Sequence, residues 1–414
     1  MNTIPPIPTL DDYRPLAGDE TIDRIRVKAA HLAGMHVVNI NSTYYGGGVA
    51  EMLSSLTLLL NDIGLKVGWR VIQGSPDYFG VTKKMHNALQ GGPINLSKQK
   101  KQIYEGVIYE NSLRNHLTHD AVIVHDPQPL PIIEHYPKTV PWIWRCHIDL
   151  TEPNPTLWNY LKQYIEKYDA VIVSREEYKQ DLITPQLVFE PAIDPFSIKN
   201  KDLSDDEIAE RLNKYDIPTD KPLVVQISRF DPWKDPQGVI DAFKLARNEI
   251  DARLVLLGNV ATDDPEGAKV YESLLKYQND EIRLLSVEDT ALVNSLQRRA
   301  AVVLQKSKRE GFGLTVAEAM WKGNPVIGGN VGGIKAQIED GVNGYLVDSV
   351  EQAARSIVEL IKHPEKRKQM GEKAKETVRQ RYLLCHYAEK YLDLLNNLEI
   401  KVVLRDGKQI GDHA

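Results

Sequence analysis

Apolar residues along the chain follow two patterns, short continuous runs and helical repeats, and the two alternate over most of its length. Residues 49–63 place apolar side chains at every third or fourth position, which predicts a helix that Gly64 ends. Residues 121–124 and 223–227 are continuous apolar runs, typical of parallel strands buried on both faces. The same patterns predict strands at residues 36–40, 66–72, 142–144, 170–174, 253–257, 282–285 and 301–304, and helices at 21–32, 98–115, 156–167, 204–213, 350–362, 365–381 and 383–397. Strands that alternate with helices predict an α/β fold with doubly wound parallel sheets.

A polar and charged stretch at residues 196–222 divides two such series. With 414 residues the chain is too long for one ordinary core, so we expect two Rossmann-like domains. The first spans residues 1–214 and is completed by a C-terminal helix, about 383–414, that packs back on it. The second spans residues 215–382.

Composition and charge narrow the classes of function. The chain is 42% hydrophobic and 26% charged, which is typical of a globular protein. Its net charge is −6 and it has no long basic cluster, so we expect neither a nucleic-acid nor a membrane partner. The N-terminus has no apolar signal core and no apolar run could span a bilayer, which predicts a cytoplasmic protein. Cys146 and Cys385 lack metal-ligand spacing, so we expect free thiols and no metal site. The helices of mixed charge show no decisive dimer stripe, so the sequence allows a homodimer but does not require one.

Residues 302–323 combine a strand, a charged loop and a glycine turn that opens a helix. A strand that turns through glycines into a helix directs unpaired N–H groups and the positive end of the helix dipole at one point, which suits a phosphate. The spacing of Thr315 and Glu318 is also that of a capping box, in which the glutamate only satisfies its own helix end. The candidate site residues of this stretch are Glu310, Gly311, Phe312, Gly313, Leu314 and Glu318.

Other strand ends also carry polar or glycine-rich loops. Gly47 and Gly48 precede the helix at 49–63, although a tight turn without a ligand explains a run of glycines equally well. Asp126 and His147 follow the strands at 121–124 and 142–144, and in open α/β sheets ligands lie beyond the carboxyl ends of the strands. A lone histidine is more often structural, so the position of His147 is the main argument for it.

Two further segments contain candidate binding residues. Residues 75–92, which include Tyr78, are rich in aromatic and polar groups and show little periodic pattern, so we expect them at the mouth of a site or on the surface. Arg229 and Lys234 follow the strand at 223–227 and could converge on one diphosphate, although a solvated loop is the commoner case. Asn259 follows the strand at 253–257 and is a candidate for the same site.

Three separated motifs, at residues 228–234, 310–318 and 328–333, occur in order after the glycine loop. They resemble the retaining glycosyltransferases of family 4, whose GT-B fold has two Rossmann-like domains facing each other across a cleft. Segments 44–51, 81–90, 125–128 and 144–149 further resemble trehalose synthases of the glycosyltransferring type and their relatives, the retaining trehalose phosphorylases. The resemblance covers nearly the whole chain.

The resemblance implies that the second domain binds a nucleotide sugar. Arg229 and Lys234 would hold the donor diphosphate, Glu318 the ribose hydroxyls, and Glu310 the donor sugar near the reacting carbon. The amides of residues 311–314 would meet the donor sugar and its phosphate.

The first domain would be the acceptor side. His147 would hydrogen-bond the donor glucose, and Gly47 and Gly48 would approach the phosphate. Asp126 and Tyr78 would contact the acceptor.

The implied enzyme is a retaining hexosyltransferase that makes α,α-trehalose from ADP- or UDP-glucose and free glucose, in a reaction that can run in both directions. No carboxylate is an obvious covalent nucleophile. The resemblance implies a front-face mechanism, in which the leaving phosphate takes the acceptor's proton. The alternatives are a retaining trehalose phosphorylase and, more distantly, a GT-B nucleotide-sugar epimerase. A dinucleotide dehydrogenase is disfavoured because no Gly-x-Gly-x-x-Gly follows the first strand. The expected ligands are sugars and nucleotide sugars, without a covalently bound cofactor; magnesium is allowed but required by no motif.

Overall fold

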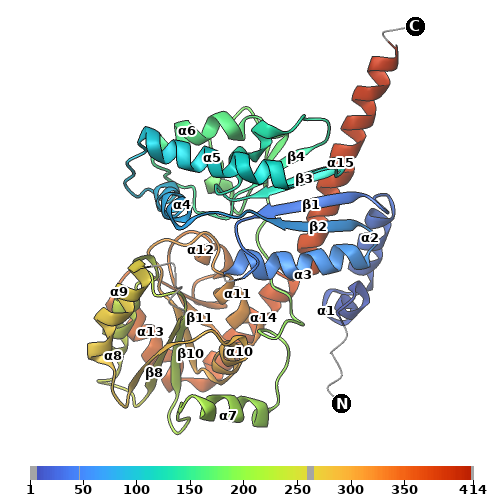
Figure 1. The fold of residues 1–414 in the computed structure, drawn as a ribbon. Helices are drawn as coiled ribbons and strands as arrows, with labels where there is room; N and C mark the ends of the chain where they lie inside the picture. Colours follow the sequence, from blue (N-terminus) through green and yellow to red (C-terminus); the bar gives the residue numbers. More distant parts are fainter. Residues whose placement is uncertain (1–6, 46, 259–264, 412–414) are drawn as a thin grey trace. The chain divides into compact units, whose positions relative to one another are not determined.

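The computed structural model describes residues 7–45, 47–258 and 265–411, and the chain divides into two compact units (Figure 1). Unit 1 consists of Met1–Ala192 and Leu384–Ala414, and unit 2 of Ile193–Leu383. Each unit contains one six-stranded sheet in which all the paired strands are parallel. Parallel neighbours need long crossover connections, which helices provide here. The predicted α/β class, with two doubly wound parallel sheets, is confirmed.

The sheet of unit 1 has the strand order β2-β1-β3-β4-β5-β6. The chain leaves β1 toward one edge and returns to its other side as β3, so the strand order reverses between β1 and β3. Helix α3 lies on one face of the sheet, and α5 and α6 lie on the other (Figure 1). The strands are β1 (His36–Asn41), β2 (Lys66–Val71), β3 (Ala121–His125), β4 (Trp142–Arg145), β5 (Ala170–Val173) and β6 (Gln186–Val188). The helices are η1 (Leu10–Tyr13), α1 (Arg14–Ala17), α2 (Asp19–Ala30), α3 (Gly48–Asp62), α4 (Pro76–Leu89), α5 (Lys98–Arg114), η2 (Leu130–His135), α6 (Pro155–Ile165), η3 (Glu176–Tyr178) and α15 (Leu384–Gly411).

The sheet of unit 2 has the order β12-β11-β10-β7-β8-β9, and it reverses between β7 and β10. Its strands are β7 (Leu223–Ile227), β8 (Arg253–Gly258), β9 (Ile282–Ser286), β10 (Val302–Gln305), β11 (Val326–Gly329) and β12 (Gly344–Val347). Its helices are α7 (Asp205–Lys214), η4 (Pro232–Lys234), α8 (Pro236–Ala246), α9 (Pro265–Leu274), η5 (Leu275–Tyr277), α10 (Thr290–Arg299), α11 (Leu314–Trp321), α12 (Ile334–Gln337), α13 (Val350–Lys362) and α14 (Pro364–Arg381). Across the described part of both units, no helix is long and apolar enough to cross a membrane.

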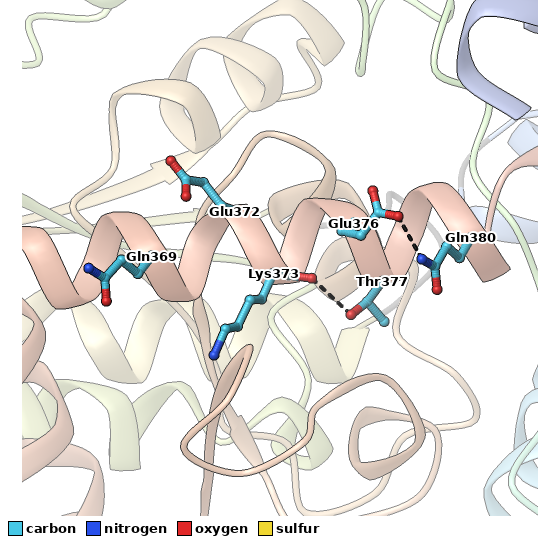
Figure 2. A pocket seen from close by; sticks show the side chains of 6 residues that line it. All are labelled: Gln369, Glu372, Lys373, Glu376, Thr377 and Gln380. Carbon is cyan, nitrogen blue, oxygen red and sulfur yellow. Dashed lines mark hydrogen bonds between the residues drawn. The ribbon is translucent and has the colours of Figure 1, made fainter.

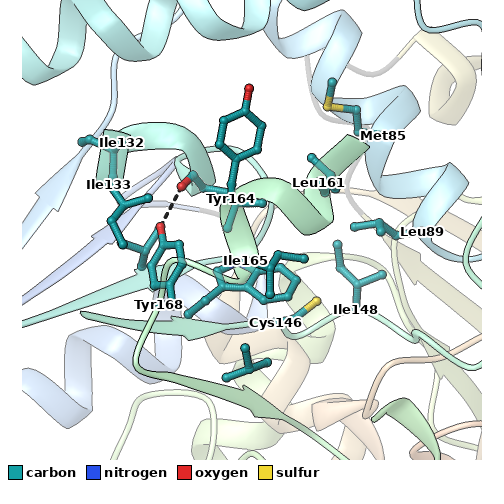
Figure 3. Packing of buried hydrophobic residues seen from close by; sticks show 14 of the residues in the cluster. Met85, Leu89, Ile132, Ile133, Cys146, Ile148, Leu161, Tyr164, Ile165 and Tyr168 are labelled. Carbon is teal, nitrogen blue, oxygen red and sulfur yellow. Dashed lines mark hydrogen bonds between the residues drawn. The ribbon is translucent and has the colours of Figure 1, made fainter. Parts of the chain in front are cut away.

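One layer of the unit 1 core lies between the sheet and helices α4 to α6 (Figure 3). Met85 and Leu89 of α4 belong to it, together with Leu161 and Ile165 of α6. Cys146, directly after β4, is buried in the same cluster as a free thiol. These side chains fix the loops that leave β3 and β4, because the loops begin where the packed strands end.

Helix α4 corrects the expectation for residues 75–92, which the sequence interpretation described as aperiodic. Ser75 caps the helix by accepting a hydrogen bond from the Tyr78 amide (3.3 Å), and Pro76 occupies its first position. Tyr78, Met85 and the other buried residues of the helix recur every three or four positions. The amphipathic signal was present in the sequence, but the interleaved lysine, histidine and glycine residues obscured it.

The boundary between the units differs from the expected one at residue 214. Helix α7 packs on α10, and Arg211 and the Tyr215 hydroxyl both reach Asp289, at 3.1 and 2.8 Å. The Asn294 side chain also donates to the carbonyls of Ile198 and Lys201, at 2.9 Å each. Residues 193–214 therefore lie with unit 2 and not with the first domain.

The C-terminal helix α15 packs in unit 1. Arg24 of α2 lies 2.6 Å from Glu389, and Lys28 lies 2.7 Å from Asp393. These ion pairs join the beginning of the chain to its last helix.

Candidate active site

The reversal of strand order in unit 2 lies between β7 and β10, which are hydrogen-bonded neighbours. In open α/β sheets this is where ligands bind, beyond the carboxyl ends of the two strands. The loop after β7 carries Arg229 and Lys234, and the loop after β10 carries Glu310. The topology thus brings together two motifs that lie far apart in the sequence.

Lys234 and Glu310 form an ion pair, with 2.5 Å between Nζ and Oε2. Both side chains are largely buried, at 17% and 12% exposed. Ser307 Oγ (3.3 Å) and Gln305 Nε2 (3.5 Å) lie near the same carboxylate oxygen. Gln226 of β7 donates to the Lys234 carbonyl (2.9 Å) and so fixes the backbone beneath the lysine. A cation and a carboxylate held at a strand end can contact the charged and hydroxylated parts of one substrate.

The Arg229 side chain is half exposed, and its closest carboxylate is that of Asp231, at 3.8 Å. This distance is too long for a hydrogen bond, so the pairing is weak. The guanidinium therefore remains accessible to an anion at the same strand end.

The turn before α11 has the shape predicted for an anion site. Gly313 has φ +83°, and α11 begins directly after it. No side chain caps the helix, although the Val316 amide donates to the Gly313 carbonyl (2.9 Å), so the N–H groups of its first residues point toward the turn. Gly333 packs so closely that a Cβ atom there would lie 2.2 Å from the Phe312 Cα. Gln337 holds the turn by donating to the Phe312 carbonyl (2.6 Å). The Phe312 ring is buried against Tyr382, so this residue can meet a ligand only through its backbone.

Glu318 is buried, and it does not form the capping box that its spacing from Thr315 allows. The helix begins after Gly313, which places Glu318 fifth in the helix rather than third. Its carboxylate lies 3.5 Å from the Lys199 ammonium. The Lys322 ammonium donates to the Glu318 carbonyl (3.1 Å); burial lowers the pKa of Lys322 to about 7, although Glu318 raises it. Glu318 is therefore free of a capping role.

In unit 1 the strand order reverses between β1 and β3, and the glycine loop follows β1. Gly47 has φ +87° and forms the N-terminal boundary of α3, again without a side-chain cap. Gly48 is the first residue of that helix. Among the described residues, and apart from its chain neighbours, no atom lies within 4 Å of a Cβ atom built at Gly47.

His147 belongs to a hydrogen-bonded chain that the sequence interpretation missed. Its Nε2 lies 3.0 Å from His125 Nδ1, and His125 Nε2 lies 3.0 Å from Asn39 Oδ1. Burial lowers the pKa of His125 to about 3 and the pKa of His147 well below its ordinary value, and the Arg145 guanidinium lowers both further. With the amide oxygen of Asn39 facing His125, the proton positions follow: His125 donates to Asn39 and His147 donates to His125. In this arrangement His147 Nδ1 carries no proton and is a hydrogen-bond acceptor. One signal in the sequence could have indicated this chain: His125 follows a continuous apolar run and is the last residue of a buried strand.

Asp126 follows His125 directly and has a left-handed backbone, with φ +63°. The His147 amide donates to its Oδ1 (2.8 Å), and the Trp144 indole donates to its carbonyl (3.0 Å). Burial raises the pKa of the Asp126 carboxyl to about 6, more than the His147 amide and Arg145 lower it. Asp126 and His147 thus lie together at the carboxyl ends of β3 and β4, as predicted.

Tyr78 differs from its expected role as an acceptor contact. The side chain is fully buried, and its hydroxyl donates to the Gln128 carbonyl (2.7 Å). The Tyr104 hydroxyl similarly donates to the Pro127 carbonyl. Tyr78 therefore holds the loop that follows Asp126 and is not available to touch a ligand. The predicted donor contact Asn259 lies outside the described residues.

A surface hollow on α14 lies outside these loops (Figure 2). Glu376 accepts a hydrogen bond from Gln380 Nε2 (2.6 Å), and Thr377 donates to the Lys373 carbonyl (2.9 Å). These bonds join neighbours on one helix, so no groups from different strand ends converge here. The hollow is lined by Gln369, Glu372, Lys373, Glu376, Thr377 and Gln380. Among the described residues, no group of three or more histidine, cysteine or acidic side chains could hold a metal ion.

Two family models match the chain. Residues 39–180 match the model described as trehalose synthase, N-terminal domain, and residues 207–377 match glycosyl transferases group 1. The chain is 43% identical over 398 residues to trehalose synthase from Thermococcus litoralis, covering 94% of this chain and 97% of the relative. It is 45% identical over 400 residues to trehalose synthase from Pyrococcus horikoshii, covering 94% and 96%. Trehalose phosphorylase from Grifola frondosa is 29% identical, covering 84% of this chain and 55% of the relative.

Solved structures show the same fold. Sucrose-phosphate synthase from Thermosynechococcus elongatus superposes with a TM-score of 0.68 at 19% identity, covering 89% of this chain and 100% of that chain. An α,α-trehalose 6-phosphate synthase from Burkholderia multivorans gives 0.70 at 15% identity, covering 89% and 99%. These findings confirm the resemblance indicated by the motifs. The chain therefore belongs to the trehalose synthase family of group 1 glycosyltransferases, and it is a hexosyltransferase with the GT-B fold.

Proposed function

We propose that the protein transfers glucose from a nucleoside-diphosphate glucose to free glucose, with retention at the anomeric carbon, and so forms α,α-trehalose. The observation that carries this proposal is the arrangement at the β7–β10 switch point. There Lys234 and Glu310 form an ion pair at 2.5 Å, and the accessible Arg229 lies in the same loop as Lys234. The loop that carries Glu310 leads into α11, whose start has no side-chain cap. Trehalose synthases 43% and 45% identical over nearly the whole chain support the identity of the product.

The charges in unit 2 suit the departure of a diphosphate. When the bond between the glucose C1 and the phosphate oxygen breaks, negative charge grows on the diphosphate and positive character grows on the sugar. Arg229 and Lys234 would offset the first charge, and the Glu310 carboxylate would face the sugar. Fixed groups of this kind lower the barrier because they need no rearrangement during the reaction.

The proposed reaction needs no covalent nucleophile. Glu310, whose Oε2 atom lies beside Lys234, Ser307 and Gln305, would instead contact the donor sugar near the reacting carbon. In the proposed front-face reaction the acceptor hydroxyl attacks C1 from the side that the phosphate leaves. Its proton passes to the departing phosphate oxygen, which balances the step.

Unit 1 would supply the sugar-binding groups. His147 Nδ1 would accept from a hydroxyl of the donor glucose, and Asp126 would bind a hydroxyl of the acceptor. The N–H groups at Gly47 and Gly48 would approach the donor phosphate, since the α3 start has no side-chain cap. The partners are thus sugars and nucleotide sugars. Neither a covalent cofactor nor magnesium is needed for these steps.

Product analysis tests the proposal. The purified protein is incubated with glucose and each nucleoside-diphosphate glucose in turn, and in parallel with glucose and glucose 1-phosphate. We expect a non-reducing disaccharide with a single α-anomeric signal by NMR, because the two glucose units of α,α-trehalose are equivalent, and we expect it to form from a nucleotide sugar. Product from glucose 1-phosphate alone would replace the proposal with a phosphorylase, and conversion of the donor without acceptor would indicate an epimerase.

A further inference from the structure

Asp235 follows Lys234 directly and has no part in the chemistry above. Its backbone is left-handed, with φ +50° and ψ +50°, and the residue is 7% exposed. It occupies the position before α8, yet its side chain makes no capping hydrogen bond to that helix. Non-glycine residues seldom adopt this conformation, and here no hydrogen bond from the Asp235 side chain to α8 accounts for it.

The Asp235 carboxylate instead points to the loop after β10. Its Oδ2 lies 2.5 Å from Lys306 Nζ, and its Oδ1 lies 2.9 Å from Lys308 Nζ. Gly238 makes room for this carboxylate, because a Cβ atom there would lie 2.2 Å from Oδ2. The backbone supports the same link, since the Lys308 amide donates to the Trp233 carbonyl (2.7 Å). Asp235 therefore joins the two loops that carry Lys234 and Glu310.

The side chains of the β10 loop divide between the two carboxylates. Gln305 and Ser307 lie beside Glu310, whereas Lys306 between them pairs with Asp235. The Lys306 side chain is only 12% exposed, so without the Asp235 carboxylate its ammonium would be a poorly hydrated cation that has lost this partner. The side-chain link between the two loops would then be lost, because a buried charge needs a partner.

We propose that Asp235 is a positioning residue for the transfer reaction, and this inference rests on the proposed function. By binding Lys306 and Lys308 and holding the left-handed bend, Asp235 fixes the loop after β7 against the loop after β10 and so keeps Lys234 aligned for the donor diphosphate. It acts through Lys234 and touches no substrate itself.

The test uses Asp235→Asn, which tolerates the left-handed backbone and keeps the size of the side chain but removes its charge. We expect kcat for glucosyl transfer to fall at least about tenfold, with a smaller change in KM, because Lys234 acts mainly as the phosphate charge develops. The matched control is Asp216→Asn, since Asp216 is also left-handed (φ +51°) but exposed. The control should keep wild-type kcat.

A double-mutant cycle separates positioning from loss of fold. In a Lys234→Ala background, Asp235→Asn should lower kcat less than about threefold, because the lysine side chain through which Asp235 acts is absent. Adding Lys306→Met to Asp235→Asn should restore part of the activity, because it removes the buried cation that Asp235 no longer neutralises. Unchanged kcat in Asp235→Asn, or a full tenfold loss in the Lys234→Ala background, would overturn the inference.

Nucleotide binding distinguishes a failure of the inference about Asp235 from a failure of the proposed function. Binding of ADP and UDP is measured by titration calorimetry in the wild type and in the same variants, without any sugar. Weaker binding in Asp235→Asn that disappears in the Lys234→Ala background supports positioning even if the sugar product is not trehalose. Equal affinity in the wild type and Asp235→Asn, in a protein that does make trehalose, counts against Asp235 alone.

Discussion

The raised pKa of Asp126 predicts that removing its charge stabilises the protein while it impairs function. Burial raises this pKa to about 6, so the folded protein disfavours the carboxylate at neutral pH. Asp126→Asn keeps an oxygen for the His147 amide and tolerates the left-handed backbone, but it needs no ionisation.

The size and sign of the effect follow from the shift. A rise from the ordinary 3.8 to about 6 corresponds to roughly 3 kcal/mol, at about 1.4 kcal/mol for each tenfold change in the ionisation equilibrium. Well below pH 4 the group is protonated in both states and costs nothing. As the pH rises from about 4 to 6, Asp126 loses its proton in the unfolded chain before it does so in the folded protein, so the free energy of unfolding falls. Above about pH 6 the full cost of ionising the buried carboxyl reduces stability. Because Asp126 is partly exposed, we expect Asp126→Asn to gain about 1 to 3 kcal/mol at pH 8 and much less near pH 4.

Scanning calorimetry at about pH 4.5 and pH 8 measures this difference. A gain of that size should raise the melting temperature at pH 8 by a few to about ten degrees. Burial also disfavours the charged forms of His125 and His147. Both histidines are present in the wild type and in the variant, so their contributions to the pH dependence of stability largely cancel. Asp216→Asn, at an exposed left-handed position, should show no such pH-dependent gain. Glucosyl transfer by Asp126→Asn should fall although the protein is more stable. A variant no more stable than the wild type at pH 8, or equally stabilised at both pH values, would refute the reasoning.

Three further substitutions test the site in unit 2. Lys234→Ala should lower kcat roughly 100-fold with the fold retained, and wild-type turnover at saturating donor would contradict its role. Glu318→Gln should weaken ADP or UDP binding about tenfold by calorimetry; unchanged affinity with a lower melting temperature would instead make its pair with Lys199 purely structural. Gly333→Ala should cost at least about 2 kcal/mol in unfolding experiments and weaken donor binding, because its methyl group would meet the backbone of the α11 turn. Gly106→Ala, in the middle of α5 with nothing within 4 Å, is its control and should be neutral or stabilising.

Much of the fold was predictable because the central strands are continuous apolar runs. Residues 121–124 and 223–227 lie within β3 and β7, both buried along their whole length. In a parallel sheet covered on both faces every position is buried, so the sequence pattern of such strands is unambiguous. The positions of Asp126, His147, Arg229 and Lys234 at strand ends followed from that pattern alone.

Local signals were less reliable where tertiary packing sets the start of a helix. The Thr315 and Glu318 spacing matches a capping box, but Gly313 turns the chain earlier and α11 begins at Leu314. Gly333 and Gln337, some twenty residues later, hold that turn in place. Helix starts of this kind depend on contacts that no short window of sequence contains.

The sequence does not predict which lysine pairs with which carboxylate in unit 2, because the pairing depends on the order of the strands in the sheet. The loop after β10 presents Lys306 and Lys308, and the loop after β7 presents Lys234 and Asp235. Any lysine could in principle pair with any carboxylate nearby. Only the adjacency of β7 and β10 brings the loops together, and only the left-handed bend at Asp235 turns its carboxylate toward Lys306 and Lys308. The Asp235 carboxylate thus pairs with Lys306 and Lys308, whereas Lys234 pairs with Glu310. A diphosphate site needs such a division, because cations that are not assigned to separate partners would repel one another in the absence of ligand.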